Sequence, residues 1–354
     1  MLYDQFSSVH ESTVVQGLDE TSLKGYAHFR HTIAESPRFV LDRSAVMMVQ
    51  NTSLTKPSGF LAAMPICRLP AKTIWVEFAF ADRAAWLKEA NRRRIITSHD
   101  IDNSSPPSRL GFLLSEEEFD DERVIDVKLA WTHRHPHIDL SLKGLKIAIN
   151  KDTKLVSQEY VEQLQEQFSK DREFPTETAR QMRAPKEIRA GAELEARMRP
   201  YVPWYFKPMW DAFKDDPVML QKMNEGADYD MLSEWRFVLS LLTVINSRNL
   251  IRVEPETDVV KLNKKRVQTG KPRLLSHRPI TLNLSPVQKR RVTRYIYEAG
   301  APRPRSSPTE PQYVLGHWKV RKSGVFWWSD HDRHYGPSGG NDNAPTPPTI
   351  RVTA

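Results

Sequence analysis

Short connections between strand-like segments constrain the fold of this chain more than any other feature. The segments RLGFLLS, ERVIDVKLAWTH and HIDLSLKGLKIAIN, which begin at Arg109, Glu122 and His137, have the apolar patterning of strands. The links between them are too short to hold a crossover helix, so consecutive strands must run antiparallel. Residues 38–150 therefore predict an α+β domain built mainly on an antiparallel sheet.

The segment KTIWVEFAF, from Lys72, is expected to add another strand to this sheet. Its alternating apolar residues would share one face: Ile74, Val76, Phe78 and Phe80. Glu77 falls on the other face, where nothing in the sequence supports a catalytic role. Helices are expected around residues 44–50 and 59–67, and another is expected to follow Asp82, a candidate N-cap.

The chain changes character after Asn150. Residues 155–168 have the spacing of an amphipathic helix, and residues 170–200 are highly charged, as in a boundary that is partly linker. Residues 201–247 are expected to be helical. The apolar spacing of one core helix runs through Trp235, Val238, Leu239, Leu242 and Ile245.

The C-terminal residues predict a small basic module of β-α-β-β type. Its expected parts are a strand (RNLIRVEP), a basic loop (KLNKKRVQTGKPR), a strand (SHRPITLNL), a helix from Ser285-Pro286 to Gly300, and a hairpin. The whole chain then divides into a polar N-terminal segment (1–37), the sheet domain (38–150), a helix and charged linker (151–200), a helical region with the basic module (201–335), and a flexible tail (336–354).

Positive charge is concentrated near the C-terminus. From Arg252 to Arg333 there are 18 Lys or Arg and 7 Asp or Glu, a net charge of +11, whereas residues 1–250 have 33 and 36, a net charge of −3. A basic face attracts phosphate polyanions or anionic surfaces. The basic module is therefore the candidate binding region, provided that its cations form one coherent patch.

The stretch GHWKVRKSGVFWWSDHDRH, residues 316–334, adds aromatic rings to these cations. It is expected to form a hairpin whose loop, Lys322-Ser323-Gly324, places glycine at a positive φ. Lys319 and Arg321 would share one face, and Trp327 and Trp328 would lie on opposite faces, so that at least one of them packs inward. Cations neutralise phosphates and rings stack on unpaired bases, which together favour DNA or RNA. The predicted nucleic-acid-binding residues are Lys264, Lys265, Arg266, Lys271, Arg273, Arg290, Arg294, Trp318, Lys319, Arg321 and Trp327.

Two other functions stay open. The basic module could dock onto an acidic surface of a phage or host protein, as part of a virion or another assembly. Alternatively, a metal-dependent nuclease could use the histidines and aspartate that cluster near the C-terminus: His317, Asp330, His331 and His334. A second alternating set, His133, His135 and His137, is interrupted by Pro136 and is expected to be a loop feature.

Motifs of known catalytic chemistry are missing from the sequence, which has no phosphate-binding loop, dinucleotide fingerprint, His-Glu-x-x-His or Gly-x-Ser-x-Gly. No cofactor is expected, and enzymatic activity is not favoured. The single cysteine, Cys67, has an apolar context that predicts a buried, inert thiol. Neither a membrane-spanning apolar run nor a secretory signal is found, so a cytoplasmic location and no membrane partner are expected.

The C-terminal motifs LNKKRVQTGKPRLLSHRPITL and GHWKVRKSGVFWWSDHDRH resemble those of uncharacterised proteins encoded by tailed bacteriophages and prophages. The segment MPICRLPAKTIWVEF belongs to the same resemblance. In the similar proteins the second motif ends in His followed by Arg-Gly, whereas this chain has Arg333-His334-Tyr335. The resemblance implies a phage gene acting in the bacterial cytoplasm, and no particular activity.

Overall fold

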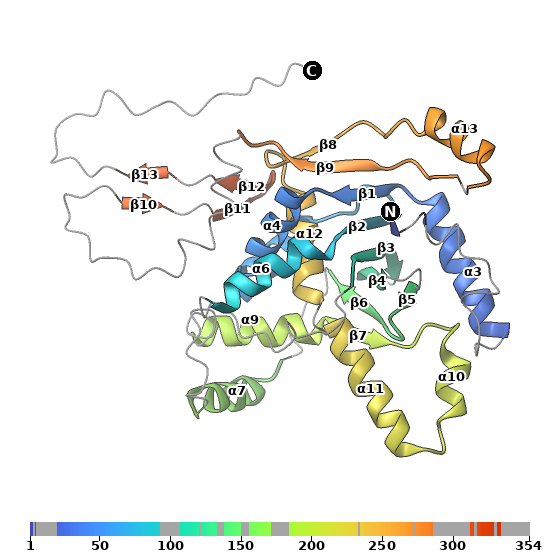
Figure 1. Ribbon diagram of the computed structural model, residues 1–354. Helices are drawn as coiled ribbons and strands as arrows, with labels where there is room; N and C mark the ends of the chain where they lie inside the picture. Colours follow the sequence, from blue (N-terminus) through green and yellow to red (C-terminus); the bar gives the residue numbers. More distant parts are fainter. Residues whose placement is uncertain are drawn as a thin grey trace, which may run out of the picture.

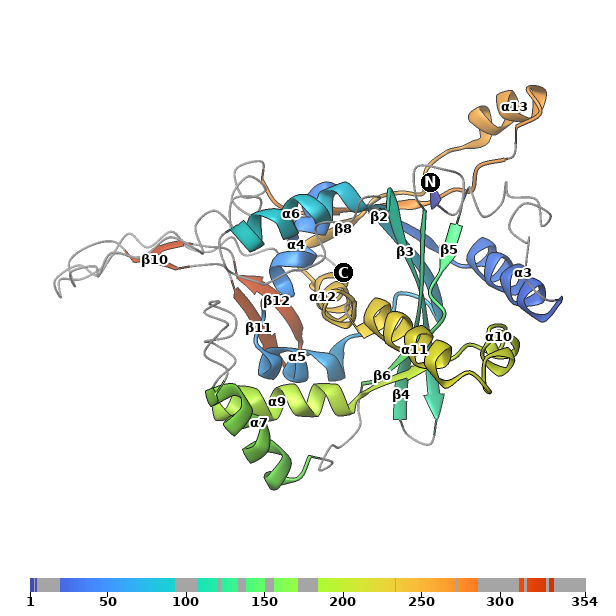
Figure 2. The same ribbon diagram turned by 60° about the horizontal axis from the view of Figure 1, so that its bottom comes forward.

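A computed structural model of the chain describes residues 1–2, 4, 20–92, 107–119, 122–132, 138–149, 156–170, 184–232, 234–271, 273–285, 312–314, 317–328 and 331–333. A mixed sheet with helices on both of its faces forms the body of the protein (Figures 1 and 2). The α+β fold class expected from the sequence is therefore confirmed. Within the described residues, no helix has the length and apolar character needed to cross a membrane.

Nine strands form the main sheet, in the order β7-β6-β4-β3-β2-β1-β9-β8, with β5 also paired to β4. Their bounds are β1 (Arg38–Leu41), β2 (Thr73–Ala79), β3 (Arg109–Phe119), β4 (Glu122–Thr132), β5 (Ile138–Leu140), β6 (Gly144–Ala148), β7 (Met198–Tyr201), β8 (Ile251–Val253) and β9 (Arg278–Leu282). All neighbouring pairs are antiparallel except those of β1, which runs parallel to both β2 and β9. The short links between β3, β4 and β5 thus give the antiparallel order that the sequence predicts.

Helices lie on both sides of this sheet, and one further helix stands away from it (Figures 1 and 2). They are α3 (Glu20–Glu35), α4 (Arg43–Thr52), α5 (Pro57–Ala63) with the 3-10 turn η1 (Met64–Ile66), α6 (Phe80–Arg92), α7 (Gln158–Lys170), α9 (Pro185–Ala196), α10 (Lys207–Ala212), α11 (Pro217–Leu232), α12 (Trp235–Ile245) and α13 (Val260–Gln268). Two further strand pairs, β10 (Gln312–Val314) with β13 (His331–Arg333) and β11 (His317–Arg321) with β12 (Gly324–Trp328), form separate two-stranded sheets.

Helix α12 lies at the centre of the main core, as its apolar spacing predicts. Its residues from Phe237 to Val244 are all buried. The Phe237 ring packs against Phe78 of β2 and Phe112 of β3, with ring centroids 4.9 and 5.5 Å apart. On the opposite face of the sheet, Phe29 of α3 packs edge-on against Trp75. Both faces of β2 are therefore buried, because helices cover each side.

The end of β2 differs from the sequence expectation. Phe80 begins α6 instead of extending the strand, and Asp82 lies in the first turn of that helix rather than at its N-cap. Glu77 is fully buried, where its carboxylate accepts hydrogen bonds from Trp75 Nε1 at 2.9 Å and Arg109 Nε at 2.8 Å. A buried carboxylate with such partners stabilises the packing of β2 on β3.

The strands β8 and β9 were expected in a separate C-terminal module, and the structure places them in the main sheet instead. β9 pairs with β1 in parallel, from Phe39 opposite Arg278 to Leu41 opposite Ile280. Ile280 and Leu282 belong to the main hydrophobic core. The region expected to be partly linker also contributes β7 and α9 to the fold, where Glu187 of α9 accepts a hydrogen bond from the Ser58 hydroxyl at 2.7 Å.

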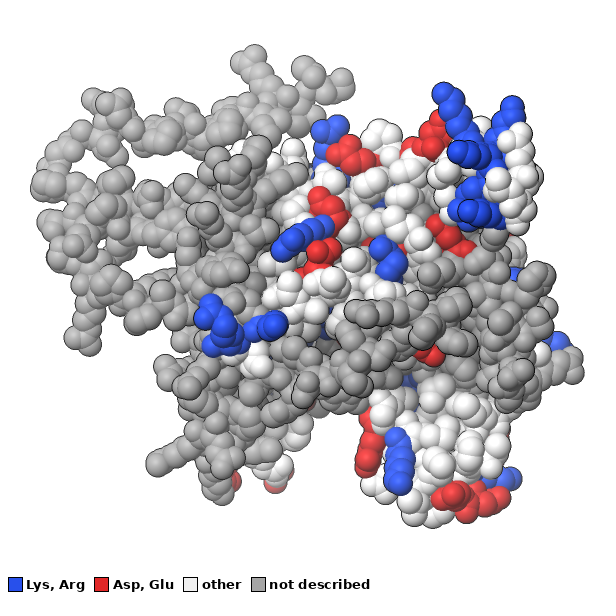
Figure 3. Space-filling view, viewed as in Figure 1, with Lys and Arg blue, Asp and Glu red and all other residues white. Residues whose placement is uncertain are grey.

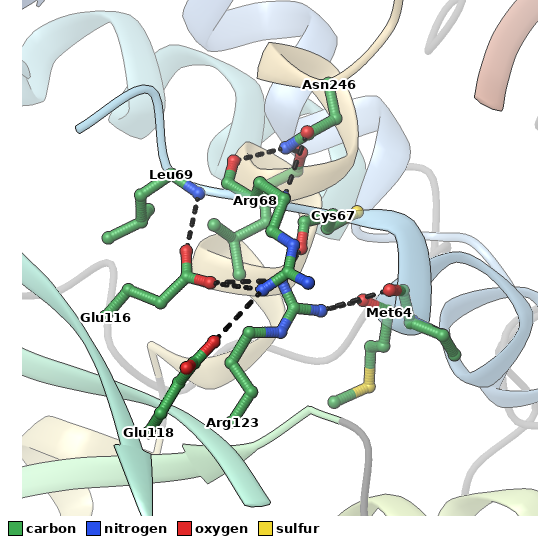
Figure 4. A network of polar contacts seen from close by, with 10 residues as sticks. Met64, Cys67, Arg68, Leu69, Glu116, Glu118, Arg123 and Asn246 are labelled. Atoms are coloured by element: carbon green, nitrogen blue, oxygen red, sulfur yellow. Dashed lines mark hydrogen bonds and ion pairs between the residues drawn. The ribbon is translucent and has the colours of Figure 1, made fainter. Parts of the chain in front are cut away.

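A buried ion-pair network joins η1 to the β3–β4 hairpin (Figure 4). Arg123 donates to the carbonyls of Met64, Pro65 and Cys67 and to Glu116 Oε1. Burial alone would raise the pKa of Glu116, but hydrogen bonds from the Leu69 amide and from Arg68 and Arg123 lower it. The guanidinium therefore holds the turn between α5 and β2 against the sheet.

Replacing Arg123 with Ala should lower the free energy of unfolding by about 3–5 kcal/mol, because Glu116 and three carbonyls lose a buried partner. Arg68→Ala provides the control, since Arg68 binds the same carboxylate from an exposed position and should cost about 0–1 kcal/mol. Urea denaturation of both variants measures the difference. Equal losses would show that the buried guanidinium has no special role.

Candidate nucleic-acid interface

A helix-tipped arm extends from the edge of the main sheet. It begins at β8 and ends at β9, and between these strands it contains residues 254–259, α13 and residues 269–277. Helix α13 stands away from the body in both ribbon views (Figures 1 and 2). Helix α13 has no buried residue. The sequence analysis expected a basic loop here, and that expectation is wrong. Lys, Arg, Gln and Leu are good helix formers, and a helix without a buried face needs no apolar periodicity.

Local hydrogen bonds are found at both ends of α13. The N-cap residue, Val259, makes no side-chain bond, but the Val260 amide donates to Asp258 Oδ1 at 2.9 Å. At the other end, Gly270 has a φ of 67°, and the amides of Gly270 and Lys271 donate to the carbonyls of Val267 and Arg266. This pair of bonds is a Schellman motif, in which the left-handed residue is normally glycine. The helix therefore begins and ends at fixed positions.

Hydrogen bonds also join α13 and the two segments that connect it to the sheet. The side-chain amide of Asn263 donates to the Leu274 carbonyl at 2.8 Å and accepts from the Leu274 amide at 2.7 Å. Nearer the sheet, the Thr257 amide donates to the His277 carbonyl, and the His277 amide donates to the Thr257 hydroxyl. These contacts give α13 a defined orientation although it buries nothing.

Three lysines occupy the face of α13 opposite Asn263. At about 100° per residue, Lys261, Lys264 and Lys265 fall within about 100° of each other and point away from the Asn263 side. All three are exposed. Among the residues that the structure describes, no carboxylate pairs with any of them. This surface, Lys261, Lys264 and Lys265, is called the lysine face below.

The other predicted cations of the arm lie near this face but not all on it. Arg266 is half-buried on the Asn263 side of the helix. Lys271 and Arg273 are exposed in the segment that returns to β9. Figure 3 shows Lys and Arg side chains gathered over α13, with Asp and Glu beside its base. Arg290 and Arg294 lie outside the described residues.

The C-terminal hairpin and the positive φ of Gly324, 135°, are as predicted, but the loop is Lys322-Ser323 alone, because Gly324 pairs with Arg321 as the first residue of β12. Lys319 pairs with Phe326 and Arg321 with Gly324, so these cations share one face. Trp318 and Trp327 pair on the other face, with ring centroids 5.0 Å apart, and pack against the main core. Trp318 or Trp327 was expected to be available for base stacking, whereas both rings pack against the core.

The cations of the arm and of the hairpin do not form one patch. The hairpin contacts Asn249, whose side chain binds the Trp327 backbone, and β8 with residues 254–259 separates Asn249 from α13. Figures 1 and 2 likewise place the hairpin and α13 at opposite ends of the β8–β9 edge. The expectation of a single coherent basic surface is therefore wrong for the described cations.

The proposed metal ligands are divided among different elements. His317 lies on β11 and His331 on β13, which belong to separate two-stranded sheets. Asp330 and His334, like His133, His135 and His137, lie outside the described residues. In the part of the chain that the structure describes, no three His, Cys, Asp or Glu side chains gather as metal ligands do. Cys67 is buried, and burial raises the pKa of its thiol to about 12, as expected for an inert cysteine.

Comparison with family models, with curated proteins and with solved structures finds no match to this chain.

Two features of the site were missed by the sequence analysis. Asn263 was read as part of a basic loop, although basic residues followed by a glycine at position 270 are a signal of a helix C-terminus. Trp328 was not selected, although strand alternation places it on the face of Lys319 and Arg321. The sequence alone does not show which face of the hairpin packs against the core, so it could not identify Trp328 as the outward ring.

The base of the arm should be sensitive to mild acid. Burial, partly offset by the charges of Glu77 and Asp4, lowers the pKa of His277. Below about pH 6.5 the unfolded chain binds a proton that the folded chain resists, so stability falls as pH decreases through this range. We expect His277→Asn to flatten this part of the profile, measured as the melting temperature of both proteins between about pH 7.5 and 5. Parallel profiles would show that His277 does not contribute.

Proposed function

We propose that this protein binds nucleic acid and that the lysine face of α13 makes the principal contacts to phosphates. The observation that carries the proposal is a helix that buries no residue and is nevertheless fixed by Asn263, Asp258 and Gly270. A charge run that only aids solubility needs no such fixation. A helix whose backbone is already ordered loses less conformational freedom when its lysines bind, which favours phosphate contact.

The spacing of the lysines suits a polyanion. Lys261 and Lys265 are one helical turn apart, a rise of about 5–6 Å, and Lys264 lies between them. Lys271 and Arg273 extend positive charge beyond the helix end. Contacts of this kind position a protein on the backbone and carry no base sequence information. The proposed binding is therefore independent of sequence and sensitive to salt.

The biological setting of the proposal comes from the sequence. The resemblance of the two C-terminal motifs to tailed-phage and prophage proteins supports a phage-encoded accessory protein that acts in the bacterial cytoplasm. Binding is the proposed activity.

A protein partner with an acidic surface is the second candidate. The observation that favours it is the exposure of apolar side chains beside the lysine face: Val260 is 73% exposed, and Leu262 and Val267 are each 50% exposed. Phosphates would leave these side chains in water, whereas an amphipathic acidic partner would cover them. Absence of polynucleotide binding at low salt would favour this candidate.

Substitution of the lysine face by glutamine, K261Q/K264Q/K265Q, should weaken binding to DNA and RNA about tenfold at about 0.1 M salt, because each exposed contact contributes about 0.2–1 kcal/mol. Glutamine keeps the helix propensity. The matched control is K207Q/K214Q/K222Q, which removes the same charge from exposed positions on and between α10 and α11. Fluorescence anisotropy with labelled oligonucleotides gives the affinities. Equal effects of the two triple variants would reduce the proposal to a general charge effect.

The fixation of α13 can be tested without changing its charge. Asn263→Ala removes both hydrogen bonds to Leu274, so we expect faster amide hydrogen exchange in α13. Because the helix must then be ordered on binding, we also expect an affinity for polynucleotides that is several-fold lower. Asn224→Ala, on α11, removes one side-chain bond to the Leu220 carbonyl and serves as the control. Unchanged amide hydrogen exchange in α13 of the Asn263→Ala variant would show that this side chain does not hold the helix in place.

A further inference from the structure

The outer face of the β11–β12 hairpin carries an aromatic ring beside two cations. The register pairs Lys319 with Phe326 and Arg321 with Gly324, and Trp328 follows Phe326 by two residues on the same face. Lys319 Nζ lies 3.2 Å from the centroid of the Trp328 ring, and Arg321 Cζ lies 5.9 Å from it. The Trp328 side chain is 41% exposed. This set, Lys319, Arg321 and Trp328, is called the hairpin face.

The inner face of the same hairpin is anchored to the body. Val325 is buried in the main core, and Trp318 and Trp327 pack against it. Asn249 binds the Trp327 backbone twice, donating from Nδ2 to its carbonyl at 2.7 Å and accepting from its amide at 3.0 Å. The Arg248 amide donates to the Val325 carbonyl. The backbone beneath the hairpin face is thus held in place before any ligand arrives.

An exposed indole beside two cations has a specific chemical preference. Its π face can stack on a nucleobase, and the cations, which follow one another along β11, can contact phosphates on one side of that base. In a duplex the bases stack on each other and their faces are hidden, so only an unpaired base can reach the ring. An acidic peptide would satisfy the cations but would leave the indole without a matching group.

The contact between Lys319 and Trp328 is compatible with base binding. An exposed cation–π contact is weaker than stacking of a base on an aromatic side chain. A base that takes the ring therefore releases the flexible lysine side chain, whose ammonium can then reach the neighbouring phosphate. The lysine covers the ring in the absence of ligand and contributes charge in its presence.

We propose that the hairpin face binds single-stranded nucleic acid, with Trp328 stacking on an unpaired base and with Lys319 and Arg321 contacting phosphates on one side of that base. The inference rests on the proposed function, because it takes a polynucleotide as the ligand. It goes further in naming a single-stranded substrate and a second contact site, at the other end of the β8–β9 edge from α13.

The test uses the full chain and measures dissociation constants for a single-stranded oligonucleotide and for a duplex of the same length. Trp328→Ala should weaken single-strand binding about tenfold and leave duplex binding unchanged, and Trp328→Phe, which keeps a ring, should retain most of the single-strand affinity. Far-ultraviolet circular dichroism and melting temperatures confirm that both variants fold. If Trp328→Ala weakens single-strand and duplex binding equally, or weakens neither, the inference is overturned.

The lysine-face variant separates this result from the proposed function. If K261Q/K264Q/K265Q weakens binding to both ligands while Trp328→Ala changes neither, the proposed function stands and the hairpin face does not bind. If Trp328→Ala weakens single-strand binding and the lysine-face variant has no effect, the hairpin face is the binding site and the role proposed for α13 fails. If the unmodified chain binds neither ligand, both proposals fall.

Discussion

The parallel pairing of β1 with β9 is the contact on which the arrangement of this protein depends. It joins residues 38–41 to residues 278–282, two segments more than two hundred residues apart in sequence, through consecutive backbone hydrogen bonds. β9 pairs in turn with β8, which is the last strand of the sheet. The connection from β8 to β9 therefore extends from the ends of the two outermost strands. The arm that carries α13 is therefore built onto the main core, and its orientation follows from that of the sheet.

The two basic sites show different physical designs. The lysine face is a set of point charges on a helix fixed by caps and by one asparagine, which suits sequence-independent contact with phosphates. The hairpin face combines charge with an aromatic surface, which suits an unpaired base. A polynucleotide that touched both would run along the edge formed by β8. Such a ligand would include a paired region at one end and an unpaired region at the other, or a single strand throughout.

Much of the fold follows from local sequence patterns. Short links predicted the antiparallel order of β3 and β4, helical spacing predicted α12, and the loop Lys322-Ser323-Gly324 predicted the β11–β12 turn. The sequence could not show the partner of β9, because parallel pairing over such a separation leaves no local signal. It also could not show that the hairpin packs through Trp318 and Trp327, since both faces carry tryptophan. The charge count located the basic region correctly but could not reveal that its cations divide between two ends of one strand pair.

The dependence of affinity on salt most directly tests whether the lysine face contacts phosphates. Each phosphate contact adds about one to the slope of log affinity against log salt concentration. For the unmodified chain and for K261Q/K264Q/K265Q, phosphate contact by α13 predicts slopes that differ by about three on duplex DNA. Identical slopes for the two proteins would contradict it, whatever their absolute affinities.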